Sequence, residues 1–236
     1  MLVRITQKCR MQCPHCMVDA SPDGEHMTME TFRKAVGFIK ANTLPLVMVS
    51  GGEPMEHPQA LEFLAMAKKE LHVVMLSNGM FLSDAGLRDA VIRLGISVQV
   101  TADPRFYKTP IQKFDHPSFM YEDRIRVVTP IGRAADNKIE CNRQSPLCFN
   151  LRSATRTTGD IWSAIDILRR GGKMCTPSIN VNGDVVAGEA SPCRKIGSVD
   201  STTQELTDGV CGMRCNACGL EDKLSVVHKH VIGLYD

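Results

Sequence analysis

The chain has 236 residues, 43% of them hydrophobic and 23% charged, which is ordinary for one folded domain or one domain with a small appendage. No apolar run approaches the ~18 to 20 residues of a membrane span. A net charge of +2 lacks the basic excess typical of nucleic-acid-binding proteins. The first residues show no secretory signal, so we expect a cytoplasmic protein with neither membrane nor nucleic-acid partners.

Short apolar runs alternate with amphipathic stretches through the first hundred residues. The apolar runs predict strands over 2–6, 46–49, 72–76 and 96–101. Helical spacing predicts three helices between these strands: one capped by Thr28, one over 58–69, and one capped by Ser83 and closed by Gly95. Strands that alternate with helices favour an α/β fold with a parallel sheet.

The pattern changes after the fourth predicted strand. Residues 104–122 lack clean periodicity and are interpreted as loop and irregular helix, whereas 124–129 has the pattern of a fifth strand. A helix is predicted from Asp160 to Gly171. Apolar residues then recur at every second position around Asn182-Gly183, which indicates a β-hairpin. We expect the α/β part to occupy 1–172 and a small β-containing subdomain to occupy 173–236.

Ten cysteines are the unusual feature of the composition. Cytosolic thiols are kept reduced, so metal binding is favoured over a disulfide framework. The cysteines fall into four groups along the chain: 9, 13 and 16; 141 and 148; 175 and 193; 211, 215 and 218. This grouping predicts two separate metal sites, one near each end of the sequence.

Cys9, Cys13 and Cys16 directly follow the first predicted strand, so a single loop can bring three thiolates to one metal centre. A four-iron cubane with three protein ligands keeps one iron open for chemistry. A zinc knuckle completed by His15 is the alternative. The C-x3-C-x2-C pattern, with His15 before its last cysteine, resembles the signature of the radical S-adenosylmethionine (SAM) superfamily.

This resemblance implies a partial (β/α)6 barrel of the TIM type. It implies that Cys9, Cys13 and Cys16 hold a [4Fe-4S] cluster, that SAM binds the open iron, and that His15 lies near the adenine. The segment after the second strand, Gly51-Gly52-Glu53, resembles the family's GGE motif, which binds the methionine amine of SAM. Two glycines permit close backbone approach, and a carboxylate accepts hydrogen bonds from an ammonium group.

Other polar residues follow the later predicted strands and look like the family's positions for the ribose and carboxylate of SAM. They are Ser77 and Asn78 after the third strand, and Thr101 and Asp103 after the fourth. An Asn-Gly turn and a strand-end threonine explain these residues equally well. Arg133, after the fifth predicted strand, lies in a segment similar to one near the SAM site of many relatives.

Four cysteines of the C-terminal part, Cys175, Cys193, Cys215 and Cys218, resemble the ligands of a twitch subdomain, the short form of the SPASM extension. The resemblance implies one auxiliary [4Fe-4S] cluster. Cys211 can replace one of these ligands, and a zinc site with four cysteine ligands is the alternative.

Cys141 and Cys148 precede the hairpin and fit neither site. A buried cysteine usually serves as a small hydrophobe. The functional alternative is that one of the two donates a hydrogen atom to a product radical.

The resemblance implies a radical SAM oxidoreductase or modifying enzyme that forms a 5′-deoxyadenosyl radical and abstracts a substrate hydrogen atom. We expect dehydrogenase-like oxidation of a small molecule, assisted by the auxiliary cluster, because the sequence starts directly at the first strand without a leader-binding domain. A maturase acting on a short peptide, by thioether or C–C bond formation or epimerisation, is one alternative. A non-catalytic iron-sulfur or zinc protein is another. An external electron donor such as flavodoxin or ferredoxin is the expected partner.

Overall fold

The computed structural model describes most of the chain, including the loop that carries the first cysteine group. The described residues are 1–43, 45–107, 110–124, 133–138, 147–170, 177–189 and 193–213. No helix in these ranges is both long enough and apolar enough to cross a membrane.

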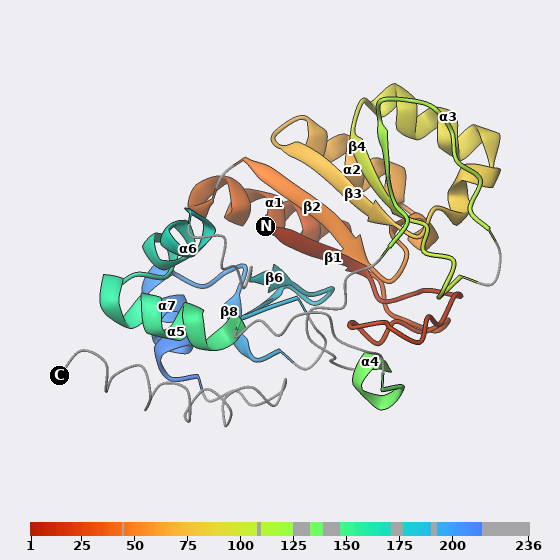
Figure 1. Cartoon of the computed structure of the whole chain (residues 1–236). Helices are drawn as coiled ribbons and strands as arrows, with labels where there is room; N and C mark the ends of the chain where they lie inside the picture. The colour runs from red at the N-terminus through yellow and green to blue at the C-terminus, as the bar shows by residue number, and fades with distance from the viewer. Residues whose placement is uncertain are drawn as a thin grey trace.

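One eight-stranded sheet runs through the described residues in the order β5-β4-β3-β2-β1-β6-β7-β8 (Figure 1). Its strands are β1 (Leu2–Thr6), β2 (Leu46–Gly51), β3 (His72–Ser77), β4 (Ser97–Thr101), β5 (Phe119–Glu122), β6 (Ser178–Ile179), β7 (Asp184–Val186) and β8 (Lys195–Ser198). Neighbours from β5 to β6 are parallel, and β6, β7 and β8 are antiparallel. The sheet does not close on itself, which confirms the predicted α/β class with a partial barrel.

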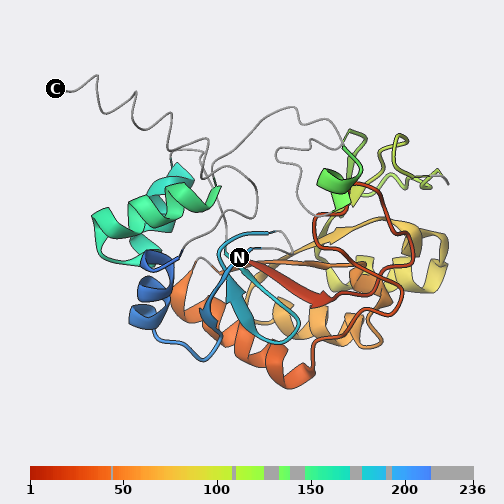
Figure 2. The ribbon, with the colours of Figure 1, turned by 90° about the horizontal axis from the view of Figure 1, so that it is seen from below.

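The core lies between the sheet and the helices that follow the first three strands. The helices are α1 (Met29–Asn42), α2 (Ala60–Lys68), α3 (Ala85–Leu94), α4 (Arg133–Asp136), α5 (Leu147–Thr158), α6 (Ile161–Arg170) and α7 (Thr203–Cys211), with short 3₁₀ turns η1 (Pro54–Glu56) and η2 (Met80–Ser83). Alternate strand residues such as Val3, Ile5 and Val49 are fully buried with Phe32 and Phe63 of the helices. Figures 1 and 2 show α5, α6 and α7 gathered at the β8 end of the sheet.

Two helix boundaries test the predicted caps. Thr28 caps α1, and its hydroxyl accepts a hydrogen bond from the Thr31 amide at 3.1 Å, as predicted. The cap of α3 is Asp84 rather than Ser83: the Asp84 carboxylate accepts from the Leu87 amide at 3.0 Å, whereas Ser83 is the last residue of η2. Gly95 closes α3 with a φ of 62°, as predicted.

The strand that pairs with β4 is not where the apolar pattern placed it. β5 (Phe119–Glu122) lies within the segment that was predicted to be loop, and the predicted strand over 124–129 falls almost entirely outside the described residues. β5 has only one deeply buried side chain, Phe119. This segment forms a strand because it pairs with β4, although its own sequence lacks a strand pattern.

The predicted hairpin is confirmed, and its first strand joins the main sheet. β6 and β7 are antiparallel around Gly183, whose φ is 86°. β6 also runs parallel to β1, with Leu2 opposite Ser178 and Val3 opposite Ile179. The predicted division between 172 and 173 lies in 171–176, outside the described residues, and remains a prediction.

Two helices of the C-terminal half, α5 and α7, were not predicted. α5 is rich in threonine and arginine, and Thr155 satisfies its buried hydroxyl by donating to the Leu151 carbonyl at 2.8 Å. α7 begins with a capping box in which Thr202 and Glu205 bind each other's amides, a signal that was present in the sequence. The two helices pack against each other beside β8.

Candidate active site

The first cysteine group lies on a loop that leaves β1 and folds back beside it. The Cys9 amide donates to the Ser21 carbonyl at 2.8 Å. At the end of the loop, the Met27 amide donates to the Ile5 carbonyl at 2.8 Å. Figure 1 shows this loop at the carboxyl end of β1. The position agrees with the general rule that parallel α/β sheets place their sites at this edge.

The three thiols of this loop are shielded from water and influence one another. Cys9 is buried, Cys13 and Cys16 are half-buried, and none of the three forms a disulfide. Burial raises the pKa of the Cys13 thiol to about 11, and the neighbouring Cys9 and Cys16 add to this increase. Three thiolates this close repel one another, so a bound metal centre is what would let them ionise together.

Among the described residues, no three histidine, cysteine or acidic side chains could hold one metal ion. The ligands of a [4Fe-4S] cubane bind separate irons and need not converge on one point.

The two glycines at the end of β2, Gly51 and Gly52, lie directly against the residues that lead to Cys9. The Gly52 amide donates to the Thr6 carbonyl, and the Glu53 amide donates to the Lys8 carbonyl, both at 2.8 Å. A Cβ added at Gly51 or Gly52 would collide with the backbone of Thr6 or Lys8, and Gly51 has a φ of 130°. Only glycine therefore lets the two loops approach this closely.

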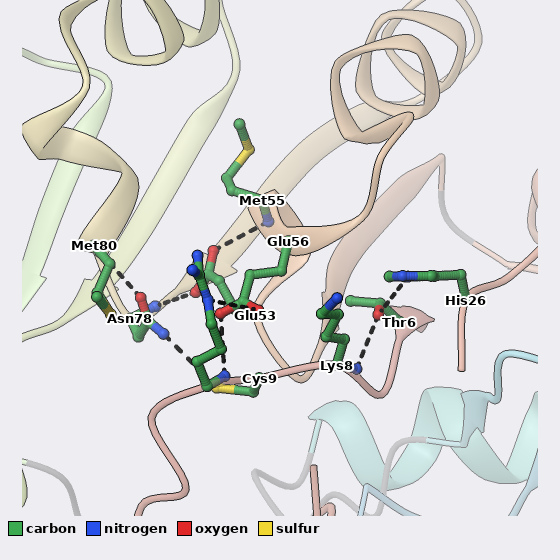
Figure 3. Close-up of polar contacts among 10 residues, drawn as sticks. Thr6, Lys8, Cys9, His26, Glu53, Met55, Glu56, Asn78 and Met80 are labelled. Atoms are coloured by element: carbon green, nitrogen blue, oxygen red, sulfur yellow. Dashed lines mark hydrogen bonds and ion pairs between the residues drawn. The ribbon is translucent and has the colours of Figure 1, made fainter. Parts of the chain in front are cut away.

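Glu53 is buried at 2% exposure and is held by three hydrogen bonds, of which those from Met55 and Asn78 are drawn in Figure 3. Its carboxylate accepts from the Ser77 hydroxyl at 2.9 Å, the Asn78 amide at 2.8 Å and the Met55 amide at 3.1 Å. Burial raises the pKa of Glu53 to about 7, although these hydrogen bonds oppose the increase. A carboxylate has about four acceptor positions, so one is left for an incoming ammonium group.

The turn after β3 links Glu53 to the cysteine loop. The Asn78 side-chain amide donates to the Cys9 sulfur at 3.9 Å, and its carbonyl oxygen accepts from the Met80 amide at 3.0 Å (Figure 3). Gly79 takes a φ of 78° to make this turn. Ser77 and Asn78, predicted from the sequence, are thus brought together with Glu53 and Cys9. Their predicted contacts with SAM remain predictions.

The segment after β4 places an aromatic wall beside His15. The Phe106 ring lies 4.2 Å from the His15 ring, and Tyr107 lies 6.2 Å from it, both measured between ring centroids. The Nδ1 atom of His15 is buried without a hydrogen-bond partner among the described residues, and burial lowers the pKa of this ring. An orphaned ring nitrogen is a place where a bound group can complete a hydrogen bond.

Thr101 and Asp103 support this wall from β4. The Thr101 side chain hydrogen-bonds to the Tyr107 hydroxyl, and burial raises the pKa of that phenol. Asp103 is fully buried, and its carboxylate accepts from the Arg105 backbone at 3.0 Å and forms an ion pair with the Arg105 guanidinium at 2.5 Å. Asp103 therefore stabilises the turn that carries Phe106.

Arg133 lies against the cysteine loop. Its guanidinium donates to the carbonyls of Ala20 and Cys13, and its backbone amide donates to Asp19 at 3.2 Å. Asn137 adds a bond to the Pro14 carbonyl at 3.0 Å. The sequence pointed to Arg133 near the SAM site, and the structure shows how it holds the loop backbone.

Glu56 is a site residue that the sequence reasoning missed. Its side chain is 9% exposed, accepts from the Arg10 amide at 3.1 Å and forms an ion pair with the Arg10 guanidinium at 3.3 Å (Figure 3). An acidic residue three positions after Glu53 was the available signal. Glu56 fastens the start of the cysteine loop to η1.

Replacing Glu56 with alanine is expected to loosen this loop. A charge-assisted hydrogen bond is worth about 1.5 to 3 kcal/mol, so local opening should become about tenfold more frequent. The measurement is the rate of trypsin cleavage after Arg10, with fragments identified by mass spectrometry. Glu62→Ala on the exposed face of α2 is the control, and equal rates in the two variants would contradict the role of Glu56.

The structure describes only part of the second cysteine set. Cys193 and Cys211 lie within the described residues, whereas Cys175, Cys215, Cys218 and Cys141 lie outside them. Cys148 lies in the first turn of α5, and only its backbone is described.

The end of α7 is tied to α5 close to where the last cysteine group begins. Arg156 donates to the Cys211 carbonyl at 2.7 Å, and Arg152 donates to the Met213 carbonyl at 2.8 Å. The point from which the chain continues toward Cys215 is therefore fixed.

Comparison with known proteins places the site in a family context. Residues 3–131 match the model of the radical SAM superfamily. The subtilosin biosynthesis protein AlbA of Bacillus subtilis is 31% identical over 85 residues, which are 35% of this chain and 19% of that protein. The PqqA peptide cyclase of Ruegeria pomeroyi is 29% identical over 99 residues, 41% of this chain and 26% of the cyclase. The match thus spans about a fifth to a quarter of these relatives.

Solved structures share the fold at low sequence identity. BtrN in complex with AdoMet and 2-DOIA superimposes with a TM-score of 0.59 at 14% identity, covering 92% of this chain and 85% of BtrN. Streptococcus suis SuiB bound to S-adenosylmethionine gives a TM-score of 0.52 at 12% identity, covering 93% and 68%. These similarities agree with the partial-barrel architecture described above.

Proposed function

Because this chain belongs to the radical SAM superfamily, we propose that it holds a [4Fe-4S] cluster on Cys9, Cys13 and Cys16 and cleaves SAM reductively there. The observation that carries the proposal is the close junction of two loops. The Gly51–Glu53 loop lies against the residues that lead to Cys9, and Asn78 bonds both Glu53 and the Cys9 sulfur. Thiol ligands and a buried carboxylate acceptor are thereby placed side by side.

The residues fit both groups that the family requires. Bound here, the cluster would supply one electron to the sulfonium of SAM, which breaks the C5′–S bond and yields methionine and a 5′-deoxyadenosyl radical that abstracts a substrate hydrogen atom. Glu53 keeps one acceptor position for the methionine ammonium, and His15 keeps an unpartnered Nδ1. Phe106 and Tyr107 shield the site from water on the side of β4.

We further propose an auxiliary [4Fe-4S] cluster on Cys175, Cys193, Cys215 and Cys218, in a twitch-type subdomain over 173–236. Two described features support it. Cys193 follows the hairpin, which is bound to β1, and α5 fixes the end of α7 just before Cys215. Oxidation of a small molecule then proceeds as loss of a hydrogen atom to the 5′-deoxyadenosyl radical, followed by loss of one electron to the auxiliary cluster and of one proton. We place this reaction in a cytoplasmic protein served by flavodoxin or ferredoxin.

Modification of a short peptide is the second candidate, and the sequence relatives favour it. Two of the sequence relatives are named for bacteriocin biosynthesis and for cyclisation of the peptide PqqA. The substrate classes can be separated with a deuterated cell extract fractionated by size. Deuterium should appear in 5′-deoxyadenosine only with the fraction that contains the substrate, and labelling by the peptide fraction alone would exclude the small-molecule proposal.

The test of the proposed function uses the anaerobically purified protein. We expect about eight irons per chain, an EPR spectrum of the reduced protein that changes on addition of SAM, and formation of 5′-deoxyadenosine. About four irons with the same response to SAM would remove the auxiliary cluster and leave SAM cleavage intact. Zinc in place of iron, or a spectrum indifferent to SAM, would contradict the proposal.

A further inference from the structure

Asn78 contacts the two halves of the candidate site through two different parts of the same residue. Its backbone amide donates to the Glu53 carboxylate at 2.8 Å, and its side-chain amide donates to the Cys9 sulfur at 3.9 Å (Figure 3). Any residue except proline supplies the backbone bond. The bond to the sulfur, by contrast, depends on the asparagine side chain.

The orientation of the Asn78 side chain is fixed within its own turn. Its Oδ1 atom accepts from the Met80 amide at 3.0 Å. A backbone N–H can donate only to the oxygen of a carboxamide, so the Nδ2 end points away from Met80 and toward Cys9. The turn itself therefore directs an N–H donor at the sulfur.

The sulfur that accepts this bond lies where added negative charge is unfavourable. Cys9 is 8% exposed, and the buried Glu53 carboxylate is bonded to the same residue, Asn78. A [4Fe-4S] cluster gains one negative charge when it is reduced, and burial and a nearby carboxylate both oppose that gain. An N–H donor to a ligand sulfur has the opposite effect, because it stabilises the extra electron density on that sulfur.

We propose that the Asn78 side chain is a positioning residue for the cluster on Cys9, Cys13 and Cys16: it orients the Cys9 sulfur and raises the reduction potential of the cluster. The inference rests on the proposed function, which puts a cluster on these cysteines. It assigns the side chain of residue 78 to the cluster rather than to the ribose or carboxylate of SAM, while the backbone amide holds Glu53. A higher potential makes the cluster easier for the external electron donor to reduce.

The test is an anaerobic redox titration of the complete protein followed by EPR, in which the signal that changes on addition of SAM identifies this cluster. Asn78→Ala should shift the reduction equilibrium about tenfold toward the oxidised state, which is about 59 mV for one electron. The dissociation constant of SAM should stay near that of the unmodified protein, because the amide that holds Glu53 is retained. Asn42→Ala is the matched control: it removes a side-chain bond to the Phe38 carbonyl at the end of α1 and should change neither quantity.

A second measurement covers the case in which Asn78→Ala does not retain the cluster. Pulsed EPR of protein labelled with 15N in the side-chain amide of asparagine should show a coupling between that nitrogen and the reduced cluster. Asn78→Asp keeps an acceptor for the Met80 amide but has no amide nitrogen, so the coupling should be lost.

The possible results separate this inference from the proposed function. An unchanged potential in Asn78→Ala, no coupling in the unmodified protein, or a coupling that persists in Asn78→Asp overturns the inference alone. Weaker SAM binding with an unchanged potential would also overturn it and would assign the side chain to SAM. Zinc in place of iron, or a spectrum indifferent to SAM, overturns the proposed function and this inference together.

Discussion

Replacing Cys13 with alanine is expected to abolish SAM cleavage. Cys13 is half-buried between Cys9 and Cys16, and its removal leaves two thiols in a loop that needs three to hold a cubane. Formation of 5′-deoxyadenosine should fall below detection, and the iron content should drop by about four per chain.

The control for this prediction is Met17→Ala in the same loop. Met17 is 40% exposed and lies directly after Cys16, so its loss tests whether any disturbance of the loop is sufficient. SAM cleavage in this variant should stay near the unmodified level. Retained cleavage in Cys13→Ala would mean that the loop does not hold the reacting cluster.

Gly52→Ala is expected to have the second-largest effect, through sterics alone. The added methyl group would collide with the Lys8 backbone, which cannot move without displacing Cys9. Overpacking of this kind costs about 3 kcal/mol, and the separation of the two loops should also abolish cluster binding. Thermal unfolding and iron content are the measurements.

Gly37→Ala is the control, and it is expected to stabilise the protein rather than to destabilise it. Gly37 lies inside α1, is exposed, and has nothing within 4 Å of an added Cβ. Alanine there should stabilise the protein by about 0.5 to 1 kcal/mol. If both glycine variants unfold at the same denaturant concentration, the close packing of Gly52 against the cysteine loop is not important.

The parts of the fold that could be predicted are those with local signals. Thr28, Gly95 and the Asn182-Gly183 turn act on residues next to them in the sequence, and each occurs where it was expected. β5 was missed because its order comes from pairing with β4. α5 was missed because threonines that bond back to the helix carry part of its buried face.

The same distinction applies to the candidate site. The spacing of Cys9, Cys13 and Cys16 is visible in the sequence, and so is the glycine pair. The bonds from Ser77 and Asn78 to Glu53 join segments about 25 residues apart, as the separations of 24 and 25 show. The buried Arg4 side chain hydrogen-bonds to Ser178 and Asn180, which lie 174 and 176 positions further along the chain. No local pattern reports such a pairing, because it exists only once β6 has joined the sheet.

The position of β1 between β2 and β6 has a consequence for biosynthesis. One edge of β1 can pair as soon as β2 has been synthesised, but the other must wait for residues 178 and 179. Until then a growing chain exposes an unpaired strand edge, which can pair wrongly with another chain. Insertion of iron into the early cysteine loop of a nascent chain would therefore occur beside an aggregation-prone edge. We expect expression at a lower transcription rate to yield more correctly loaded protein, because fewer nascent chains are then present to pair wrongly with one another.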